Sequence, residues 1–178
     1  MPAKTEWLDD EQRAAWVRLA AVMELLPGAL DSQLRRDADV THFEYYVLAM
    51  LSEAHAGTLR MTELARQTNA TLPRLSHVVS RLESRSLVER FPCPEDRRAT
   101  NARLTEMGWA KLREAAPGHV ANVRHHVIGA LTDEQIDQLA AIGGAILARL
   151  DPTGSMAATY TRYDDPPAPP TREQSGSA

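Results

Sequence analysis

Arginine side chains are the groups in this 178-residue chain best suited to do chemistry, and they are densest in the segment FPCPEDRRATNARL, residues 91–104. Between its apolar ends this segment holds two prolines, two acids and three arginines. A guanidinium group stays positively charged and donates hydrogen bonds that match a phosphate or the edge of a guanine. The segment therefore predicts contact with nucleic acid, and a solvated hairpin tip is the alternative.

Catalytic motifs are missing from the sequence. It contains no glycine-rich phosphate loop, nucleophile elbow or HExxH motif, so an enzyme is the least favoured class. Of the six histidines, His119, His125 and His126 lack the i, i+4 spacing that points two imidazoles the same way. His42 and Glu44 do not share a helix face either. We predict no cofactor and no metal, and leave open a metal site assembled from distant segments.

The charge is divided unevenly along the chain. The net charge is −4, but residues 56–115 hold eleven Lys/Arg and seven Asp/Glu, which makes this part +4 and the remainder −8. Such an asymmetry favours nucleic-acid binding by the middle of the chain. A solvated charged face explains it equally well.

Nothing in the sequence indicates secretion or a membrane. The first residues, MPAKTEWLDDEQR, are charged throughout and lack the apolar stretch of a signal peptide. The longest uncharged apolar run, 140–148, is far shorter than the roughly 20 residues that span a bilayer. The single cysteine, Cys93, forms no intrachain disulfide. We expect a cytoplasmic protein with no membrane partner.

Two helices are predicted before residue 57. Apolar residues recur at helical spacing over about 9–36, with Pro27 inside the run, where we expect a kink. Thr41 and Glu44 then form the pattern of a capping box. The helix that follows carries an apolar stripe and ends before Gly57.

Residues 57–104 have the pattern of a winged helix-turn-helix. After one short strand at 57–60, Thr62 is expected to cap a short helix that Asn69 ends in the left-handed conformation. Thr71 caps the next helix, about 72–85, which turns Leu75, Val78, Val79 and Leu82 inward and shows Arg74, Ser76, His77, Ser80, Arg81 and Arg85 on its other face. Two short helices joined by about three residues are typical of a helix-turn-helix, whose second helix fits a DNA major groove.

The arginine-rich segment follows this unit as a predicted hairpin. Its strands are expected at 87–91 and 101–104, joined by a loop of nine residues, 92–100. Hairpin loops are usually shorter, and long ordered loops are commonly functional. The loop is predicted to be a wing whose arginines reach the neighbouring minor groove.

Two further helices and a tail complete the chain. Thr105 caps a helix predicted to run to about 130, with a bend at Pro117-Gly118, and Thr132 caps another that ends at about 150. The last helix is apolar around much of its circumference, which predicts a subunit contact. Residues 151–178 contain five prolines and few aliphatic residues, a composition typical of a disordered tail.

The sequence resembles the MarR family of bacterial transcription regulators over roughly residues 10–150. HFEYYVLAML, MTELARQTNATLPRLSHVVSRLESRSLVER and PEDRRATNARLTEMGW carry the resemblance, and the last is the most specific. It implies a homodimer in which the helices at 9–36, 105–130 and 132–150 interlock. It also implies binding to a palindromic operator as a repressor, with release by a small ligand or an oxidant.

The resemblance also implies roles for individual residues. Arg98 would enter the minor groove, Asp96 would brace its guanidinium, and Arg97 would lie on phosphate. The full set of predicted DNA contacts is Thr62, Thr71, Arg74, Ser76, His77, Arg81, Asp96, Arg97 and Arg98. For His77 a base, a phosphate or water remain alternatives. Trp16, His42, Tyr45 and Tyr46 would line a pocket for a small aromatic ligand, or belong to the core.

Two positions depart from the family pattern. Ser86 stands where the family usually has glycine, so either a serine adopts the left-handed conformation or the turn differs. Redox-sensing members carry a reactive cysteine near the N-terminus, whereas Cys93 lies in the wing.

The expected fold is mainly α with a small β-wing, built as one domain over 1–150 that joins a winged helix-turn-helix lobe to helical dimerisation elements. The expected function is sequence-specific regulation of transcription. A winged-helix module that binds protein without specific DNA contact is the alternative.

Overall fold

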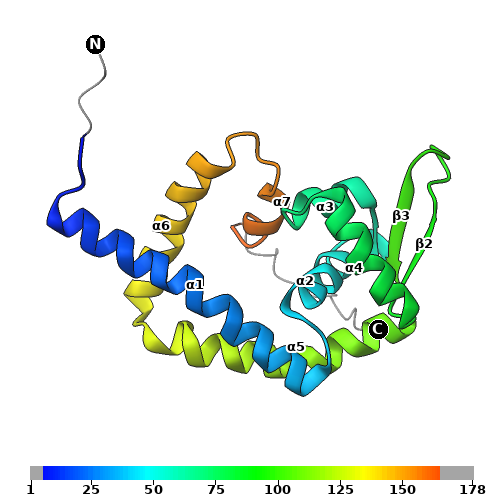
Figure 1. Ribbon diagram of the computed structural model, residues 1–178, viewed down its shortest axis with the longest axis horizontal. Helices are drawn as coiled ribbons and strands as arrows, with labels where there is room; N and C mark the ends of the chain where they lie inside the picture. The colour runs from blue at the N-terminus through cyan, green and yellow to red at the C-terminus, as the bar shows by residue number, and fades with distance from the viewer. Residues whose placement is uncertain (1–5, 165–178) are drawn as a thin grey trace, which may run out of the picture.

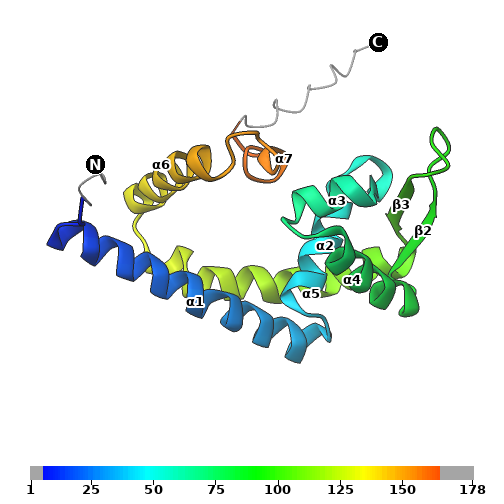
Figure 2. The same cartoon turned by 45° about the horizontal axis from the view of Figure 1, so that its top comes forward.

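The computed structural model describes residues 6–164 and is mainly helical, as predicted. Its elements are α1 (Asp10–Ala38), α2 (His42–Ser52), β1 (Thr58–Arg60), α3 (Met61–Gln67), α4 (Leu72–Ser84), β2 (Val88–Pro92), β3 (Thr100–Leu104), α5 (Glu106–His126), α6 (Asp133–Leu150) and α7 (Ala157–Tyr160). Helices α1 and α5 pack side by side, α2–α4 and the sheet gather at one end of α5, and α6 turns back from the other end (Figures 1 and 2).

The DNA-binding lobe predicted at residues 57–104 forms around one apolar core. Its three antiparallel strands are ordered β1-β3-β2, and the β2–β3 hairpin pairs Val88 with Leu104 and Pro92 with Thr100. The core comprises buried residues from α2, α3, α4 and the sheet: Val47, Leu48, Met50, Leu51, Met61, Leu64, Ala65, Leu75, Val78, Val79, Leu82, Leu87, Val88, Ala102 and Leu104. Because the strands extend one residue further than predicted at the tip, the wing loop is residues 93–99 rather than 92–100.

Local signals set the start and end of most elements. Capping boxes close the N-termini of α1, α2 and α6 through Asp9, Thr41 and Thr132. Asn69 adopts the predicted left-handed conformation after α3 (φ 48°), and Ser86 does so after α4 (φ 56°). Serine therefore occupies a turn that favours glycine, because a Cβ atom crowds the backbone in this region.

A glycine explains how the long helix α5 begins against the lobe. A Cβ atom at Gly108 would collide with the carbonyl oxygen of Leu87. Thr105 caps α5 through the Gly108 N–H (3.0 Å), and its hydroxyl donates to the Ser86 carbonyl (2.6 Å). The pattern Leu-Thr followed by Gly thus joins α5 to the turn after α4.

Several predicted boundaries were wrong. Thr62 does not cap α3, because β1 passes directly into the helix and Arg60 is the N-cap residue. Helix α5 ends at His126 and a short 3-10 turn follows, where the chain folds back so closely that a Cβ atom at Gly129 would lie 2.8 Å from the Arg124 carbonyl oxygen. Helix α1 contains Pro27, as predicted, and ends at Ala38, two residues beyond the predicted end.

The first part of the predicted tail has a defined structure. Asp151 accepts hydrogen bonds from Ser155 and from the Met156 N–H (2.7 Å), and Thr159 donates to the Gln67 carbonyl oxygen of the lobe (3.3 Å). Arg162 forms an ion pair with Glu53 (3.6 Å). The prediction of disorder was therefore wrong for 151–164, while 165–178 lie outside the described residues.

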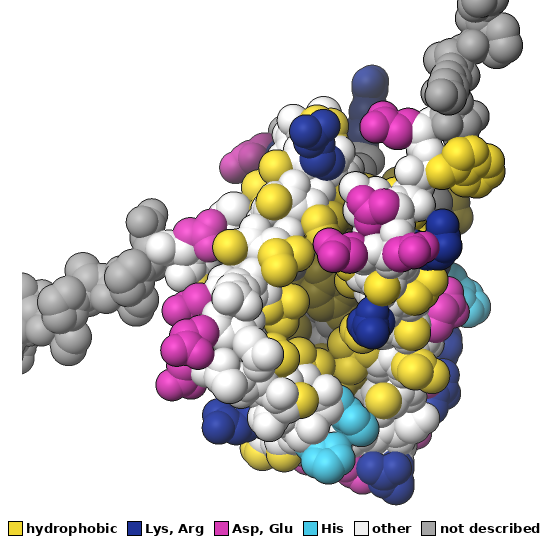
Figure 3. Space-filling view, turned by 90° about the vertical axis from the view of Figure 1, so that its left-hand side faces the viewer, with side chains coloured by type: hydrophobic (Ala, Val, Ile, Leu, Met, Phe, Trp, Pro, Cys, Tyr) yellow, Lys and Arg dark blue, Asp and Glu magenta, His cyan; other side chains and the backbone are white. Residues whose placement is uncertain are grey.

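The far end of the molecule, α1 and α6, leaves many apolar side chains uncovered. No residue of α6 is buried, and Ile142 is 57% exposed. Large apolar residues of both helices are exposed in the single chain: Trp16, Val17, Leu19, Val22, Met23, Leu25, Leu139, Ile142, Ile146 and Leu150. Hydrophobic side chains line a hollow on this face of the molecule (Figure 3).

Candidate nucleic-acid interface

Helix α4 packs one side into the lobe and leaves the opposite side open. Its buried side is the stripe predicted from the sequence. With about 3.6 residues per turn, Pro73, His77 and Ser80 lie opposite this stripe, and all three are exposed. Ser80 was not among the predicted contacts, although its spacing from His77 places both on the same side.

Two edges border the open side of α4. The arginine edge consists of Arg74, Arg81 and Arg85, which contact Phe43, Glu44 and Asp39, respectively, near the start of α2. The wing edge consists of Leu72, Ser76 and Glu83 and faces the β2–β3 hairpin. The predicted contacts on α4 are therefore divided between two edges and the open side.

The wing tip exposes both predicted arginines, Arg97 and Arg98. The loop is closed by hydrogen bonds from the Cys93 N–H to the Ala99 carbonyl (2.9 Å) and from the Ala99 N–H to the Asp96 carbonyl (2.8 Å). The Asp96 carboxylate accepts the backbone N–H of Arg98 at 3.1 Å. Asp96 therefore braces the backbone of Arg98 and not its guanidinium, which corrects the predicted pairing.

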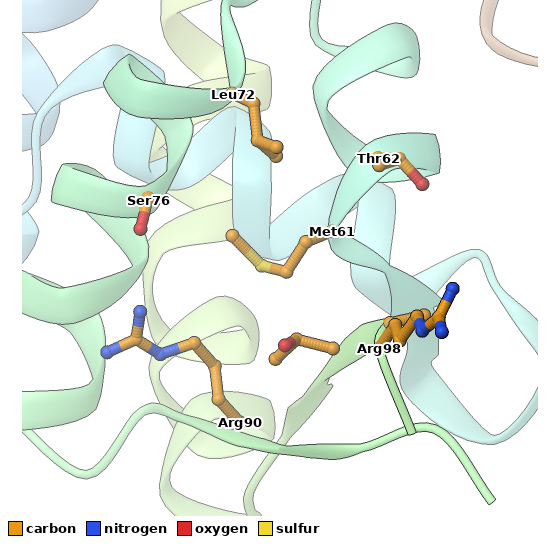
Figure 4. A pocket seen from close by; sticks show the side chains of 8 residues that line it. Met61, Thr62, Leu72, Ser76, Arg90 and Arg98 are labelled. Carbon is orange, nitrogen blue, oxygen red and sulfur yellow. The ribbon is translucent and has the colours of Figure 1, made fainter. Parts of the chain in front are cut away.

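A cavity of about 220 Å³ separates the wing from α4. Thr62 and Arg98 lie on one side of it and Ser76 and Arg90 on the other, with Met61 between them (Figure 4). Ser76 contributes a hydroxyl group and Arg98 a guanidinium to this lining, and both groups can donate hydrogen bonds to phosphate oxygens. Thr62 of α3, Ser76 of α4 and Arg98 of the wing loop thus line one cavity.

Arg90 also lines this cavity, although it was not among the predicted contacts. Its guanidinium lies 2.6 Å from Glu83 Oε2, and its backbone N–H donates to Glu83 Oε1 at 3.1 Å. These hydrogen bonds hold the pKa of the Glu83 carboxyl below its usual value. Through this pair α4 and the wing hairpin are joined, a contact for which spacing along the chain offers no signal.

The four residues predicted to line a ligand pocket are not gathered in one place. Tyr46 packs on the lobe core and donates its hydroxyl to the Gln67 carbonyl (3.2 Å). Trp16 is 53% exposed on α1. Tyr45 and His42 lie together with His119 of α5, at ring-centroid distances of 4.5 and 6.2 Å from it. His119 was not among the predicted pocket residues, and Trp16 and Tyr46 lie outside this group.

The two histidines of this group are half-buried. Burial lowers the pKa of both imidazoles, while the nearby Asp31 carboxylate opposes this for His42 and the neighbouring His42 adds to it for His119. The Asp31 carboxylate also accepts the backbone N–H of His42 at 2.8 Å. This contact joins α1 to the first residue of α2.

The described residues were also searched for metal-binding groups and membrane spans. Within 6–164, no three His, Cys, Asp or Glu side chains are placed to hold a metal ion. Over the same range, no helix has the length and apolar character needed to cross a bilayer. The lone Cys93 is buried at the base of the wing loop.

Comparisons with known proteins agree with this geometry. Residues 40–100 match the family model described as the MarR family. The crystal structure of Sco3205 from Streptomyces coelicolor, a MarR family transcriptional regulator solved in complex with DNA, is 41% identical in sequence and has a TM-score of 0.80, covering 83% of this chain and 92% of that chain. AbsC from the same organism, also a MarR family transcriptional regulator, is 38% identical with a TM-score of 0.78, over 82% of this chain and 98% of that one.

Among curated proteins, the transcriptional repressor MprA of Escherichia coli K12 is 30% identical over 107 residues, which is 60% of each chain. The match therefore spans about 60% of the length of that relative. Together with the similarity to Sco3205 over nearly its whole length, these findings show that the chain belongs to the MarR family.

Proposed function

We propose that this protein is a transcriptional regulator that binds double-stranded DNA through α4 and the wing. The observation that carries the proposal is the pairing of an open α4 side with exposed arginines on both flanks, Arg74 and Arg81 on one and Arg98 on the other. A helix of this kind fits a major groove, and an arginine on a hairpin fits the adjacent minor groove. The similar protein Sco3205 was solved with DNA bound.

Individual DNA contacts are part of the proposal. His77 and Ser80, opposite the buried stripe, would face base edges. Phosphates would be contacted by Arg74, Arg81 and Arg97. Hydrogen bonds to the DNA backbone would come from Thr62, Thr71 and Ser76 and would fix the position of the protein on the duplex. Asp96 would act indirectly, by fixing the backbone from which the Arg98 side chain extends.

The acting form is proposed to be a homodimer. Exposed apolar residues on α1 and α6 are too many for a monomer surface, because contiguous apolar patches of this kind mark interaction sites. A two-fold dimer presents two α4 helices, so its operator would be palindromic with half-sites about one helical turn, roughly 34–36 Å, apart. Repression is the proposed outcome, since MprA is named a transcriptional repressor.

A small-molecule effector is the least supported part of the proposal. His42, Tyr45 and His119 form a half-buried aromatic group between α1, α2 and α5 that an aromatic ligand could stack against. CouR from Rhodococcus jostii, whose similarity shows the fold alone, was solved with p-coumaroyl-CoA bound. Two of the four residues predicted to line a ligand pocket, His42 and Tyr45, belong to this group together with His119.

The test is a selection of duplexes from a random-sequence pool, followed by titration of the recovered operator at several salt concentrations. Counterion release predicts a log–log slope of about −0.9 per neutralised phosphate. Arg98→Ala should weaken operator binding by about 1–3 kcal/mol and leave the dimer intact. Arg113→Ala removes an exposed arginine of α5 outside α4 and the wing, and serves as the matched control. Recovery of no duplex, or weak binding that ignores salt, would favour a protein-interaction module.

A further inference from the structure

The arginine edge of α4 is held by one short stretch of chain, residues 39–44, which joins α1 to α2. The Arg74 guanidinium lies 4.4 Å above the centre of the Phe43 ring, Arg81 Nη2 lies 2.9 Å from Glu44 Oε1, and Arg85 Nη2 lies 3.2 Å from Asp39 Oδ2. The Asp39 side chain is almost fully exposed, so its ion pair contributes little. Phe43 and Glu44 are the partners that restrain the edge.

Glu44 has two tasks in this stretch. Its Oε2 atom accepts the Thr41 N–H at 2.8 Å and completes the capping box of α2, which fixes the position of the carboxylate. Its other oxygen, Oε1, faces Arg81 across the contact with α4. Glu44 is 1% exposed. The contact with Arg81 is an ion pair without the geometry of a directed hydrogen bond, so it acts through charge and position.

Arg81 is restrained on one side only. Its side chain is 51% exposed, although the carboxylate it contacts is buried. A guanidinium carries five N–H donors in a planar fork, so contact at one nitrogen leaves the others for a second acceptor. A side chain already held in place loses less rotamer freedom when it binds. The buried Glu44 carboxylate also offsets the positive charge of Arg81, and so reduces the attraction of Arg81 to phosphates outside the position in which it is held.

We propose that Glu44 is a positioning residue for DNA recognition: it holds the Arg81 guanidinium for one backbone phosphate beside the major groove, and thereby favours operator over non-operator DNA. The inference rests on the proposed function. A freely moving arginine adapts to any phosphate, whereas a held one contacts phosphate only when α4 sits in the correct register. Phosphate contacts fix register in this way without reading bases.

The test is Glu44→Gln, which removes the charge and keeps the capping box, because glutamine serves at this position as well as glutamate. Affinity is measured for the operator recovered from a random-sequence pool and for a scrambled duplex of the same composition. The ratio of the two affinities should fall about 10-fold, with the operator bound more weakly and the scrambled duplex no less tightly. Glu53→Gln is the matched control, since Glu53 is the C-cap residue of the same helix and pairs with Arg162, which lies outside α4.

A second measurement separates positioning from a general structural effect. In the Arg81→Ala background, Glu44→Gln should leave the affinity ratio unchanged, because the effect of Glu44 passes through Arg81. The inference is overturned if Glu44→Gln leaves the ratio of operator to scrambled-duplex affinity unchanged, including the case in which binding to both duplexes weakens by the same factor. It is also overturned if Glu44→Gln lowers this ratio equally in the presence and absence of the Arg81 side chain. If the wild-type protein recovers no duplex from the pool, the proposed function itself fails.

Discussion

The winged-helix lobe and the α1–α6 end of the molecule differ in what covers their apolar side chains. In the lobe, Leu48, Leu64, Leu75 and Leu82 are completely buried by neighbouring elements of the same chain. In α6 no residue is buried, although apolar residues cover much of its circumference. The spacing of apolar residues in a helix therefore identifies a face that is to be buried, but it does not show whether the residues that bury it belong to the same chain.

This difference has a consequence for folding. A lobe that closes its own core gains its hydrophobic stabilisation within one chain, whereas in the proposed homodimer the exposed faces of α1 and α6 would gain theirs from the second chain. Mutations in the two regions should accordingly respond differently to protein concentration. The proposed homodimer makes this contrast testable.

The largest expected effect comes from a charge placed on the exposed apolar face of α6. Ile142→Asp would bury an unpaired carboxylate twice in a two-fold interface, because each chain contributes one. At several kcal/mol per buried unpaired charge, the dissociation constant of the dimer should rise by at least about 1,000-fold. Sedimentation over a range of protein concentrations measures this directly.

Ala141→Asp is the control for that variant. It adds the same charge one position away, beside Glu134 and Asp137 on the polar side of α6. This variant should remain dimeric. A dimer that survives Ile142→Asp, or that is lost equally in both variants, would remove α6 from the interface.

A core substitution in the lobe should act within the single chain. Leu82→Ala leaves a cavity at a fully buried site and should reduce the free energy of unfolding by about 2–5 kcal/mol. Urea unfolding followed by circular dichroism measures the loss, which should be the same at all protein concentrations once dissociation is accounted for. Leu72→Ala, at a half-exposed position of the same helix, should cost much less. Equal costs would mean that the lobe core is not where the structure places it.

The turn after α4 offers a smaller effect of opposite sign. Ser86 adopts a left-handed conformation (φ 56°) that strains a residue with a Cβ atom. Ser86→Gly should therefore stabilise the lobe by up to about 1 kcal/mol, measured by thermal unfolding. Ser84→Gly, placed in the last turn of the helix, should destabilise it by about 0.5–1 kcal/mol. If both substitutions destabilise, the backbone strain at Ser86 is relieved by other contacts.

The features that could be predicted from the sequence are those with local causes. Thr71 and Asn69 mark the turn between α3 and α4 because capping and left-handed backbone are properties of a few neighbouring residues. The inward stripe of α4 follows from its period. The same reasoning failed at Thr62, where pairing of β1 with β3 brings the chain straight into α3. Here tertiary pairing overrode a good capping residue.

Contacts between distant residues could not be predicted in this way. Glu44 looked like half of a capping box, and its ion pair with Arg81 depends on how α2 packs against α4. Asp96 was expected to pair with the Arg98 guanidinium, but the tight wing loop places the Arg98 N–H closer. Composition also led to a wrong prediction of disorder for residues 151–164. Asp151 accepts hydrogen bonds from Ser155 and Met156 and thereby orders a segment rich in small polar residues.

The smallest expected effect concerns that segment, which connects α6 to the lobe and so links the two regions compared above. The Asp151 carboxylate accepts hydrogen bonds from the Met156 N–H, from Ser155 and from the Tyr160 hydroxyl, and these hold its pKa at about 2 instead of 3.8. Because the pKa is lowered by folding, the stabilisation is complete above about pH 4 and is lost as the pH falls toward 2.

Amide exchange at Ser155 and Met156, corrected for intrinsic rates, should therefore accelerate over this range before exchange at Leu64 in the lobe core does. In Asp151→Asn these two amides should be less protected at pH 5 and should lose this pH dependence. If the amides of the segment and of the lobe core lose protection together at every pH, the segment unfolds only with the lobe and Asp151 does not control it separately.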